Sequence, residues 1–409
     1  MPRNYQLDKK ELWDGNLAAA HAWRQAQLDV VAAYPITPST PLVEGYGEFY
    51  ANGYIDGEYV MVESEHAAMS ACVGAAAAGG RVATATSSQG LAFMIEVLYQ
   101  ASGMRVPIVL ELVNRALGAP LNVNIDHSDM YLTRDAGWIS LDALTAQDAY
   151  DMTLMAFRIS EHPDVRLPVI VNQDGLLTSH TVVGVETLSD EEAYKFVGEY
   201  KAVNSLLDTD RPVTYGAQTE ENWHYEHKAR QHHDLIKSRS IIEEIFAEFE
   251  ALTGRKHSAT KEYMIEDAEV VIVCLGSTFG TAMHAVNLMR EEGIKAGVFA
   301  HQILRPFPLL DIREKLQHVK VIGALDRSSP GGAMGALFNE YCGAFSNLSG
   351  DRLICNYIYG LGGRDVTVEQ ISAIYKTLEA DKKAGKLTHD LQCFSGLRGP
   401  DISFYGLGE

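Results

Sequence analysis

The sequence predicts an α/β protein with two successive domains that each contain a parallel sheet. Short apolar segments alternate with helical segments in the first 180 residues, and the same alternation resumes at residue 268. A polar stretch rich in His and Glu, residues 186–262, separates the two parts. Strands that alternate with helices in this way are typical of parallel sheets covered by helices on both faces.

Each half of the chain contributes several expected elements. In the first half, residues 107–113 are apolar throughout, as expected for a central strand buried on both faces. The expected strands are residues 30–34, 59–62, 81–86, 107–113, 167–171, 270–275, 296–300, 319–324 and 353–358. The expected helices are residues 16–26, 65–79, 90–103, 146–160, 281–292, 333–345 and 367–378.

The domain boundaries follow from these patterns. Residues 1–255 form the expected first domain, with a helical connector from about residue 186 that contains an amphipathic helix over 238–252. Residues 256–380 form the expected second domain. Residues 381–409 have little periodicity, and we expect them to form an arm at a subunit interface.

Composition excludes several function classes. With 54 acidic and 34 basic residues, the formal charge of −20 disfavours binding to nucleic acid or to an anionic membrane. Five scattered cysteines predict reduced thiols in the cytoplasm and argue against an iron–sulfur cluster in this chain. The polar N-terminal segment has no signal-peptide core, and the small-residue run 67–79 is too short to span a bilayer.

Some familiar site patterns are missing or have an ordinary explanation. The chain has neither GxGxxG nor GxxxxGK[ST], so a self-contained dinucleotide or P-loop site is unsupported. The turn at residues 276–280 could receive an anion at a helix N-terminus, but a tight strand-to-helix turn is favoured. Four histidines, His224, His227, His232 and His233, could suggest a metal, but a solvated polar connector is favoured. No metal site is therefore predicted in this chain.

The first candidate site segment is Tyr34-Pro35-Ile36-Thr37-Pro38-Ser39-Thr40, directly after an expected strand. Its two prolines restrict the backbone and prevent a helix from beginning before Pro38. A rigid loop at the carboxyl end of a parallel strand is a usual place for ligands in α/β proteins, and Thr37 would offer a hydroxyl there. The alternative is an ordinary proline turn with a capping hydroxyl.

The second candidate is Glu65, which lies where a strand ends and a helix of small residues begins. A helix with so little side-chain bulk lets a backbone or a flat ligand approach closely. The alternative is a carboxylate that merely stabilises the positive end of the helix dipole.

The third candidate is Arg115, which follows the apolar strand at 107–113. A guanidinium at the carboxyl end of a central strand can bind a carboxylate with two hydrogen bonds. The alternative is an ion pair with Asp126 or Asp129. Since all three candidates lie at the carboxyl ends of strands in one expected sheet, we expect them to converge on one crevice.

The ordered set of motifs resembles the α subunit of pyruvate:ferredoxin oxidoreductases, in the wider family of 2-oxoacid:ferredoxin oxidoreductases. The resemblance covers roughly residues 16–375. Its motifs are YPITPST at 34–40, ESEHAA at 63–68, Ser88-Gln89-Gly90, NRAL at 114–117, Asp126-His127-Ser128-Asp129, LRPFP at 304–308 and GLGGRD at 360–365.

This resemblance implies a fold and a set of site residues. Residues up to about 255 would be a pyrimidine-binding domain of the thiamine-enzyme type, and the following domain would resemble the C-terminal domain of transketolases. Glu65 matches the glutamate that contacts N1′ of the aminopyrimidine of thiamine diphosphate, and Pro35 and Ile36 match the loop that lies against this cofactor. Thr37 and Arg115 match the residues that hold the carboxylate of the 2-oxoacid.

The resemblance also implies partners. Thiamine enzymes bind Mg²⁺ and the diphosphate through a GDG segment, which is absent; Asp174-Gly175 lacks the first glycine. The Mg²⁺–diphosphate half would lie on a β subunit, and γ and δ subunits would complete the complex with its [4Fe-4S] clusters. The expected reaction is oxidative decarboxylation of pyruvate with CoA to acetyl-CoA and CO₂, with electrons passed to ferredoxin, in either direction. Alternatives are another 2-oxoacid, such as 2-oxoisovalerate, 2-oxoglutarate or oxalate, or a non-catalytic scaffold subunit.

Overall fold

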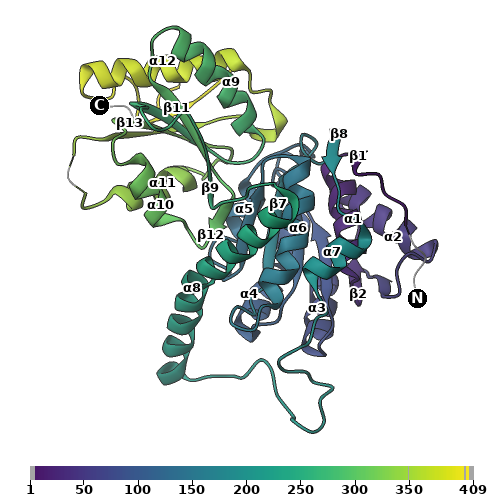
Figure 1. Ribbon diagram of the computed structural model, residues 1–409. Coiled ribbons are helices and arrows are strands. Elements are labelled where there is room, and N and C mark those ends of the chain that lie inside the picture. Colours follow the sequence, from purple (N-terminus) through teal and green to yellow (C-terminus); the bar gives the residue numbers. More distant parts are fainter. Residues whose placement is uncertain (1–4, 349, 400–401, 405–409) are drawn as a thin grey trace.

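Two central sheets organise the chain, and helices cover both faces of each (Figure 1). The computed structural model describes residues 5–348, 350–399 and 402–404. Within these residues strands and helices alternate along most of the chain, which confirms the predicted α/β class.

The first sheet has seven strands in the described chain, six of them parallel. Its order is β12 (Ile303–Arg305), β6 (Ile139–Ala143), β7 (Val169–Asp174), β5 (Val109–Asn114), β4 (Val82–Thr86), β2 (Val30–Ala33) and β3 (Glu58–Met61). Every residue of β5 and β7 is buried, as expected for central strands covered on both faces.

The helices of the first half form two layers. The first layer, which packs with one set of alternating strand residues, consists of α1 (Gly15–Ala26), α2 (Thr40–Ala51) and α6 (Ala146–Glu161). The second layer, on the opposite face, consists of α3 (Glu65–Ala77), α4 (Ser88–Met104) and α5 (Ser128–Leu132). Side chains on successive strand residues point to opposite faces, so one apolar strand supplies both cores.

The second sheet has its own pair of helical layers. Its order is β15 (Gln392–Phe394), β14 (Leu353–Ile358), β13 (Val321–Asp326), β10 (Val270–Cys274), β11 (Ala296–His301) and β9 (Thr260–Tyr263). One face packs against α9 (Thr278–Glu291) and α12 (Val368–Ala384), and the other against α10 (Leu309–Leu316) and α11 (Ala336–Phe345).

One strand crosses between the two halves of the chain. β12 follows β11 in sequence but pairs antiparallel with β6 of the first sheet. The apolar core on the α3–α4 face also continues into the α10–α11 face of the second sheet. The two sheets therefore share a strand exchange and a continuous core.

The polar stretch between the sheets is more ordered than the sequence indicated. It contains α7 (Asp190–Val197) and α8 (Glu221–Thr253), and the short strand β8 (Val183–Glu186) pairs with β1 (Lys10–Trp13) just before it. The expected start of the amphipathic helix at residue 238 was wrong, because α8 begins at Glu221. Residues 221–230 are exposed on all sides, so this part of the helix has no apolar stripe that periodicity could detect.

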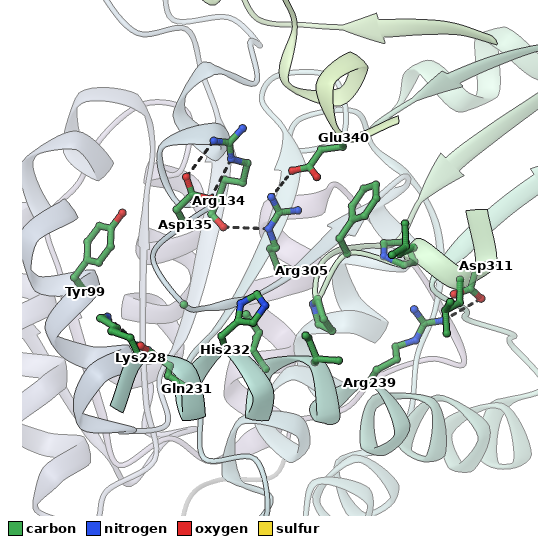
Figure 2. Close-up of a pocket in the computed structure, with 18 residues that line it drawn as sticks. Tyr99, Arg134, Asp135, Lys228, Gln231, His232, Arg239, Arg305, Asp311 and Glu340 are labelled. Atoms are coloured by element: carbon green, nitrogen blue, oxygen red, sulfur yellow. Dashed lines mark hydrogen bonds and ion pairs between the residues drawn. The ribbon is translucent and has the colours of Figure 1, made fainter. Parts of the chain in front are cut away.

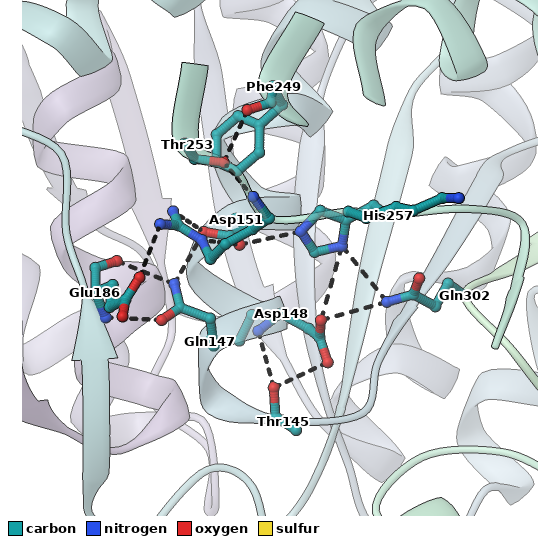
Figure 3. Close-up of polar contacts among 12 residues, drawn as sticks. Thr145, Gln147, Asp148, Asp151, Glu186, Phe249, Thr253, His257 and Gln302 are labelled. Atoms are coloured by element: carbon teal, nitrogen blue, oxygen red, sulfur yellow. Dashed lines mark hydrogen bonds and ion pairs between the residues drawn. The ribbon is translucent and has the colours of Figure 1, made fainter. Parts of the chain in front are cut away.

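A buried aspartate fixes the chain where α8 leads into the second sheet (Figure 3). Asp151 of α6 is fully buried and accepts hydrogen bonds from Nε and Nη2 of Arg255 at 2.8 and 2.7 Å. His257 Nε2 lies 3.0 Å from the same carboxylate. This double attachment holds the connecting segment against the first sheet.

The C-terminal segment is partly integrated in the second sheet. β15, within the expected arm, forms a parallel pair with β14. Residues 400–401 and 405–409 of that arm lie outside the described residues, and the interface role of the arm stays a prediction.

Candidate functional site

The predicted site residues follow adjacent strands at the carboxyl edge of the first sheet. The strand order β5-β4-β2-β3 brings the segments after these four strands to one edge. The helix after β2 lies on one face of the sheet and the helix after β4 on the other. Such a switch point leaves a crevice between the strand ends, which is the usual ligand position in open α/β sheets.

The loop after β2 is held by neighbouring polar groups. Asn16 Nδ2 donates to the carbonyl of Pro38 at 2.9 Å, and Ser39 Oγ donates to the carbonyl of Ile36 at 2.8 Å. Pro35 and Thr37 are exposed, and Ile36 is half-buried. The loop is therefore fixed at its base and presents its first residues outward.

Arg115 is brought to this loop. Its Nη1 donates to the carbonyl of Thr37 at 2.8 Å, and its Nε donates to the carbonyl of Asn122 at 3.2 Å. Burial lowers the pKa of Arg115, which is 7% exposed, although the nearby charge of Asp129 opposes this effect. The structure thus joins Thr37 and Arg115 through the Thr37 carbonyl oxygen rather than through its hydroxyl group.

Asp129 positions the backbone around Arg115 instead of pairing with its guanidinium. One carboxylate oxygen, Oδ2, accepts from the backbone N–H groups of Ser88 and Arg115, each at 2.9 Å. The other accepts from Asn114 Nδ2 at 3.1 Å and from the N–H of Met130 at 2.7 Å. Full burial raises the pKa of Asp129 to about 6, partly offset by these hydrogen bonds. The sequence motif contained Asp129, but its linking role was not predicted.

Glu65 begins α3 and lies against the first turn of α4. Its N-terminal neighbour Ser64 caps the helix by accepting from the N–H of Ala67 at 3.1 Å. A Cβ at Gly90 would lie 2.7 Å from Glu65 Oε1, so Gly90 leaves the space that this side chain occupies. Glu65 is 8% exposed, and within the described residues its carboxylate has no hydrogen-bond or ion-pair partner. A nearly buried carboxylate without a partner is costly, so a donor from a bound molecule would stabilise it.

Ser88 and Gln89 connect the end of β4 to the segment after Arg115. Ser88 adopts a φ of 48°, and its hydroxyl donates to the carbonyl of Ala116 at 2.5 Å. A Cβ at Gly118 would lie 2.8 Å from Gln89 Nε2, so the amide of Gln89 lies directly against that glycine. These contacts bring the second and fourth motif segments together at the crevice.

The Gly276 turn does receive anions, and they come from the chain itself. The N–H of Gly276 donates to Asp142 at the end of β6 at 2.8 Å, and the N–H and hydroxyl of Ser277 donate to Asp174 at 2.8 and 2.6 Å. Burial raises the pKa of Asp142 to about 7, an effect that the nearby His127 partly offsets. Two carboxylates of the first sheet thus bind the start of α9, which joins the two sheets.

Asp174 also neutralises two buried cationic groups. Its Oδ1 lies 2.9 Å from His127 Nε2, and its Oδ2 lies 3.5 Å from Arg327 Nη1, with all three side chains buried. Burial by itself would raise the pKa of Asp174, but the charge of and hydrogen bond from His127, together with Arg327, give a net lowering. This aspartate is therefore fully engaged in holding the two sheets together.

Replacing Asp174 with alanine is expected to open this junction. The change leaves Arg327 buried without its anion and Ser277 without its acceptor, a loss that costs about 3–5 kcal/mol for a buried pair. Hydrogen exchange at residues 276–278, measured in the assembled protein, checks the loss of protection. The control is Asp267→Ala, which breaks a 2.8 Å pair with Arg290 at the surface and should cost at most about 1 kcal/mol. Equal protection in both variants would contradict the junction role.

A separate cavity of about 1160 Å³ lies between α4, α8 and the LRPFP segment (Figure 2). Its cations are largely paired: Arg305 contacts Glu340 at 2.5 Å, and Arg134 contacts Asp135 at 3.0 Å. His232 lines this cavity, whereas Thr37, Glu65 and Arg115 do not. His224, His227 and His233 are exposed on α8.

Comparison with known proteins identifies the family. Residues 21–247 match the thiamine diphosphate-binding domain of pyruvate flavodoxin/ferredoxin oxidoreductases, and residues 268–371 match the core domain II of pyruvate:ferredoxin oxidoreductase. The chain therefore belongs to the pyruvate flavodoxin/ferredoxin oxidoreductase family, as its motifs predicted.

Two relatives match nearly the whole chain. Pyruvate synthase subunit PorA of Thermotoga maritima is 46% identical over 384 residues, which cover 94% of this chain and 97% of that protein. Ketoisovalerate oxidoreductase subunit VorA of Pyrococcus abyssi is 40% identical over 386 residues, which cover 94% of this chain and 97% of that protein.

Two solved structures share the fold. A 2-oxoglutarate:ferredoxin oxidoreductase from Magnetococcus marinus has a TM-score of 0.71 at 22% identity; the match covers 90% of this chain but 65% of that longer chain. A split-gene transketolase has a TM-score of 0.50 at 12% identity, with 91% of this chain and 97% of that chain covered. The expected thiamine-enzyme and transketolase-like fold is thereby confirmed. In the described part of the chain, no helix combines the length and the hydropathy that a bilayer crossing requires.

Proposed function

We propose that this chain is the α subunit of a 2-oxoacid:ferredoxin oxidoreductase that acts on pyruvate, with CoA as acceptor and ferredoxin as the electron carrier. One observation carries the proposal: the motif residues Glu65, Thr37 and Arg115 follow adjacent strands around one crevice, in a chain 46% identical to a pyruvate synthase subunit. The reaction converts pyruvate and CoA to acetyl-CoA and CO₂ and can run in either direction.

A second substrate has a specific observation in its favour. A ketoisovalerate oxidoreductase subunit is 40% identical over a similar length, so 2-oxoisovalerate is the competing 2-oxoacid. The higher identity to the pyruvate synthase subunit and the small side chains after Arg115, in Ala116, Gly118 and Ala119, support pyruvate.

The crevice suits the aminopyrimidine of thiamine diphosphate. Glu65 offers a nearly buried carboxylate without a partner among the described residues, and the small residues of α3 and Gly90 leave room beside it. We propose that Glu65 accepts a hydrogen bond from the ring and that Pro35 and Ile36 lie against it. When bound, the cofactor supplies a carbon nucleophile and an electron sink for loss of CO₂. A charged acceptor in a site shielded from water makes a strong hydrogen bond, so Glu65 can hold the proton distribution on the ring.

Arg115 and Thr37 would receive the substrate. Arg115 is largely buried, and its guanidinium already touches the Thr37 loop, so both groups border one position. A fork of N–H donors binds a carboxylate with defined orientation. Because Asp129 holds the backbone of Arg115 rather than its guanidinium, the positive charge remains available for a substrate anion.

The Mg²⁺–diphosphate half and the electron-transfer clusters would lie on partner subunits, which we propose to be β, γ and δ chains. Asp174, the aspartate of the incomplete GDG segment, is occupied by His127 and Ser277, and this supports a metal site on another chain. The exposed Thr37 loop is a surface that a β subunit would cover. We also propose a cytoplasmic location, a division into residues 1–255 and 256–380, and an interface role for the arm at 381–409.

The test is anaerobic reduction of ferredoxin by the co-purified complex with CoA and, in separate reactions, pyruvate, 2-oxoisovalerate, 2-oxoglutarate or oxalate. Reduction with pyruvate is the expected result. Reduction only with another acid would retain the family and overturn the substrate. No reduction by a complex that contains thiamine and iron–sulfur clusters would favour a scaffold subunit.

Gly90 provides a test of the space beside Glu65. In Gly90→Ala, the new Cβ would come within 2.5 Å of Thr86 Oγ1 and 2.7 Å of Glu65 Oε1, so the carboxylate must move. Displacement of a reacting group by about 1 Å can lower turnover by about 10²-fold. The matched control is Gly103→Ala on the same helix, where nothing lies within 4 Å of the new Cβ, and turnover should be unchanged. Equal turnover of the two variants would contradict the packing of Glu65 against Gly90.

A further inference from the structure

Three potential metal ligands from distant parts of the second half of the chain meet beside the edge of its sheet. They are Cys355 in β14, Asp381 in α12 and His389 in the segment that leads to β15. Their ligand atoms all lie within 4.8 Å of one another. Cys355 and Asp381 are fully buried, and the side chain of His389 is 16% exposed. This cluster lies outside the crevice, so its role does not depend on the proposed function.

The hydrogen bonds of His389 leave one ring nitrogen facing a carboxylate. Its Nδ1 lies 2.6 Å from the carbonyl oxygen of Asp390, which can only accept, so Nδ1 carries a proton. The other nitrogen, Nε2, lies 2.9 Å from Asp381 Oδ2. In a neutral imidazole, two lone pairs would therefore face each other, and a cation is required between them.

Either a proton or a metal ion can provide that positive charge. A proton on Nε2 would make an ion pair, and Thr388 already supports the other oxygen of Asp381 through its N–H and hydroxyl, both at 2.7 Å. An ion pair, however, leaves the thiol of Cys355 with only a long contact of 3.7 Å to the carbonyl of Ile322. A metal ion uses all three groups.

We propose that Cys355, Asp381 and His389 bind a zinc-type divalent cation. Sulfur, imidazole and carboxylate donors together select zinc over Mg²⁺ or Ca²⁺, which prefer oxygen ligands only. Bond lengths of about 2.0–2.3 Å place tetrahedral ligands about 3.3–3.7 Å apart, so small side-chain shifts complete the site. Its fourth position is next to the hydroxyl of Tyr357, which lies 3.2 Å from His389 Nε2.

Two further features match a zinc site. The hydrogen bond from Nδ1 of His389 to a backbone carbonyl is the usual orienting contact of a metal-bound histidine. Binding replaces the proton of the Cys355 thiol with the metal, so one proton passes to solvent for each ion bound. No oxidation or reduction is involved.

The site would attach the C-terminal segment to the second sheet. Asp381 lies near the end of α12, His389 precedes β15, and Cys355 lies in the neighbouring strand β14. A metal that joins these three elements would close the segment between residues 381 and 389 and hold β15 in register.

Zinc content of the purified complex tests the proposal. After growth with zinc and purification without chelators, elemental analysis should give about one zinc ion per copy of this chain. The zinc X-ray absorption spectrum of the unaltered complex should contain one sulfur and at least two lighter ligands. This spectrum needs no variant and so does not depend on the folding of altered chains.

Variants then assign the ligands. Zinc should fall by about tenfold or more in both Cys355→Ser and His389→Gln, and exposure of residues 385–395 to protease should rise. The control is Cys342→Ser, which removes a half-buried thiol of α11 and should leave the zinc content unchanged. Absence of zinc from the unaltered complex after incubation with zinc salts, or full zinc in both ligand variants, would overturn the proposal in favour of a simple Asp381–His389 ion pair.

Discussion

Replacing Glu65 with glutamine is expected to lower turnover by about 10²- to 10⁴-fold while the complex still assembles. Glutamine has nearly the same shape, so the packing against Gly90 and the start of α3 should persist. It removes the negative charge that would hold the proton distribution on the aminopyrimidine. A neutral amide makes a weaker hydrogen bond than a carboxylate in the same shielded position.

The measurement combines turnover with cofactor content. Steady-state reduction of ferredoxin by the assembled Glu65→Gln complex gives turnover, and thiamine analysis shows whether the cofactor stays bound. The control is Glu63→Gln, two residues earlier on an exposed position, which should retain full turnover. Normal turnover of the Glu65 variant, with cofactor present, would remove Glu65 from the site.

Replacing Arg115 with alanine should mainly weaken use of the 2-oxoacid. Loss of charge-assisted hydrogen bonds to a carboxylate costs about 1.5–3 kcal/mol, which corresponds to a rise in KM of about 10- to 100-fold. We expect the dependence on CoA concentration to change little, because Arg115 is assigned to the 2-oxoacid alone.

Arg115 also donates to the Thr37 carbonyl, so a structural effect must be separated from a binding effect. Arg115→Lys retains the charge without the fork of donors and should restore part of the affinity. If only the position of the loop mattered, lysine and alanine would be equally defective at every substrate concentration. The exposed Arg211 supplies a control, because Arg211→Ala should leave KM unchanged. An unaltered KM in Arg115→Ala would contradict the assigned role.

Local patterns predicted the parts of the structure that depend on nearby residues. The apolar segments at 107–113 and 270–275 correspond to β5 and β10, since a strand covered on both faces must be apolar along its length. The motif order predicted the family, and the positions of Thr37, Glu65 and Arg115 after strands indicated one edge of one sheet. The first half of α8 was missed because its residues 221–230 are exposed all round.

The sequence by itself determined the α/β class, the family and a short set of candidate site residues, because each of these depends on local periodicity or on motif order. Only the tertiary structure decided which distant groups meet. It paired β12 with β6, placed Asp142 and Asp174 at the turn before α9, and gave Asp129 its position behind Arg115. The same holds for Cys355, Asp381 and His389, which have no recognisable ligand spacing. Such contacts arise from the packing of buried polar groups, each of which must find a partner wherever the fold brings one.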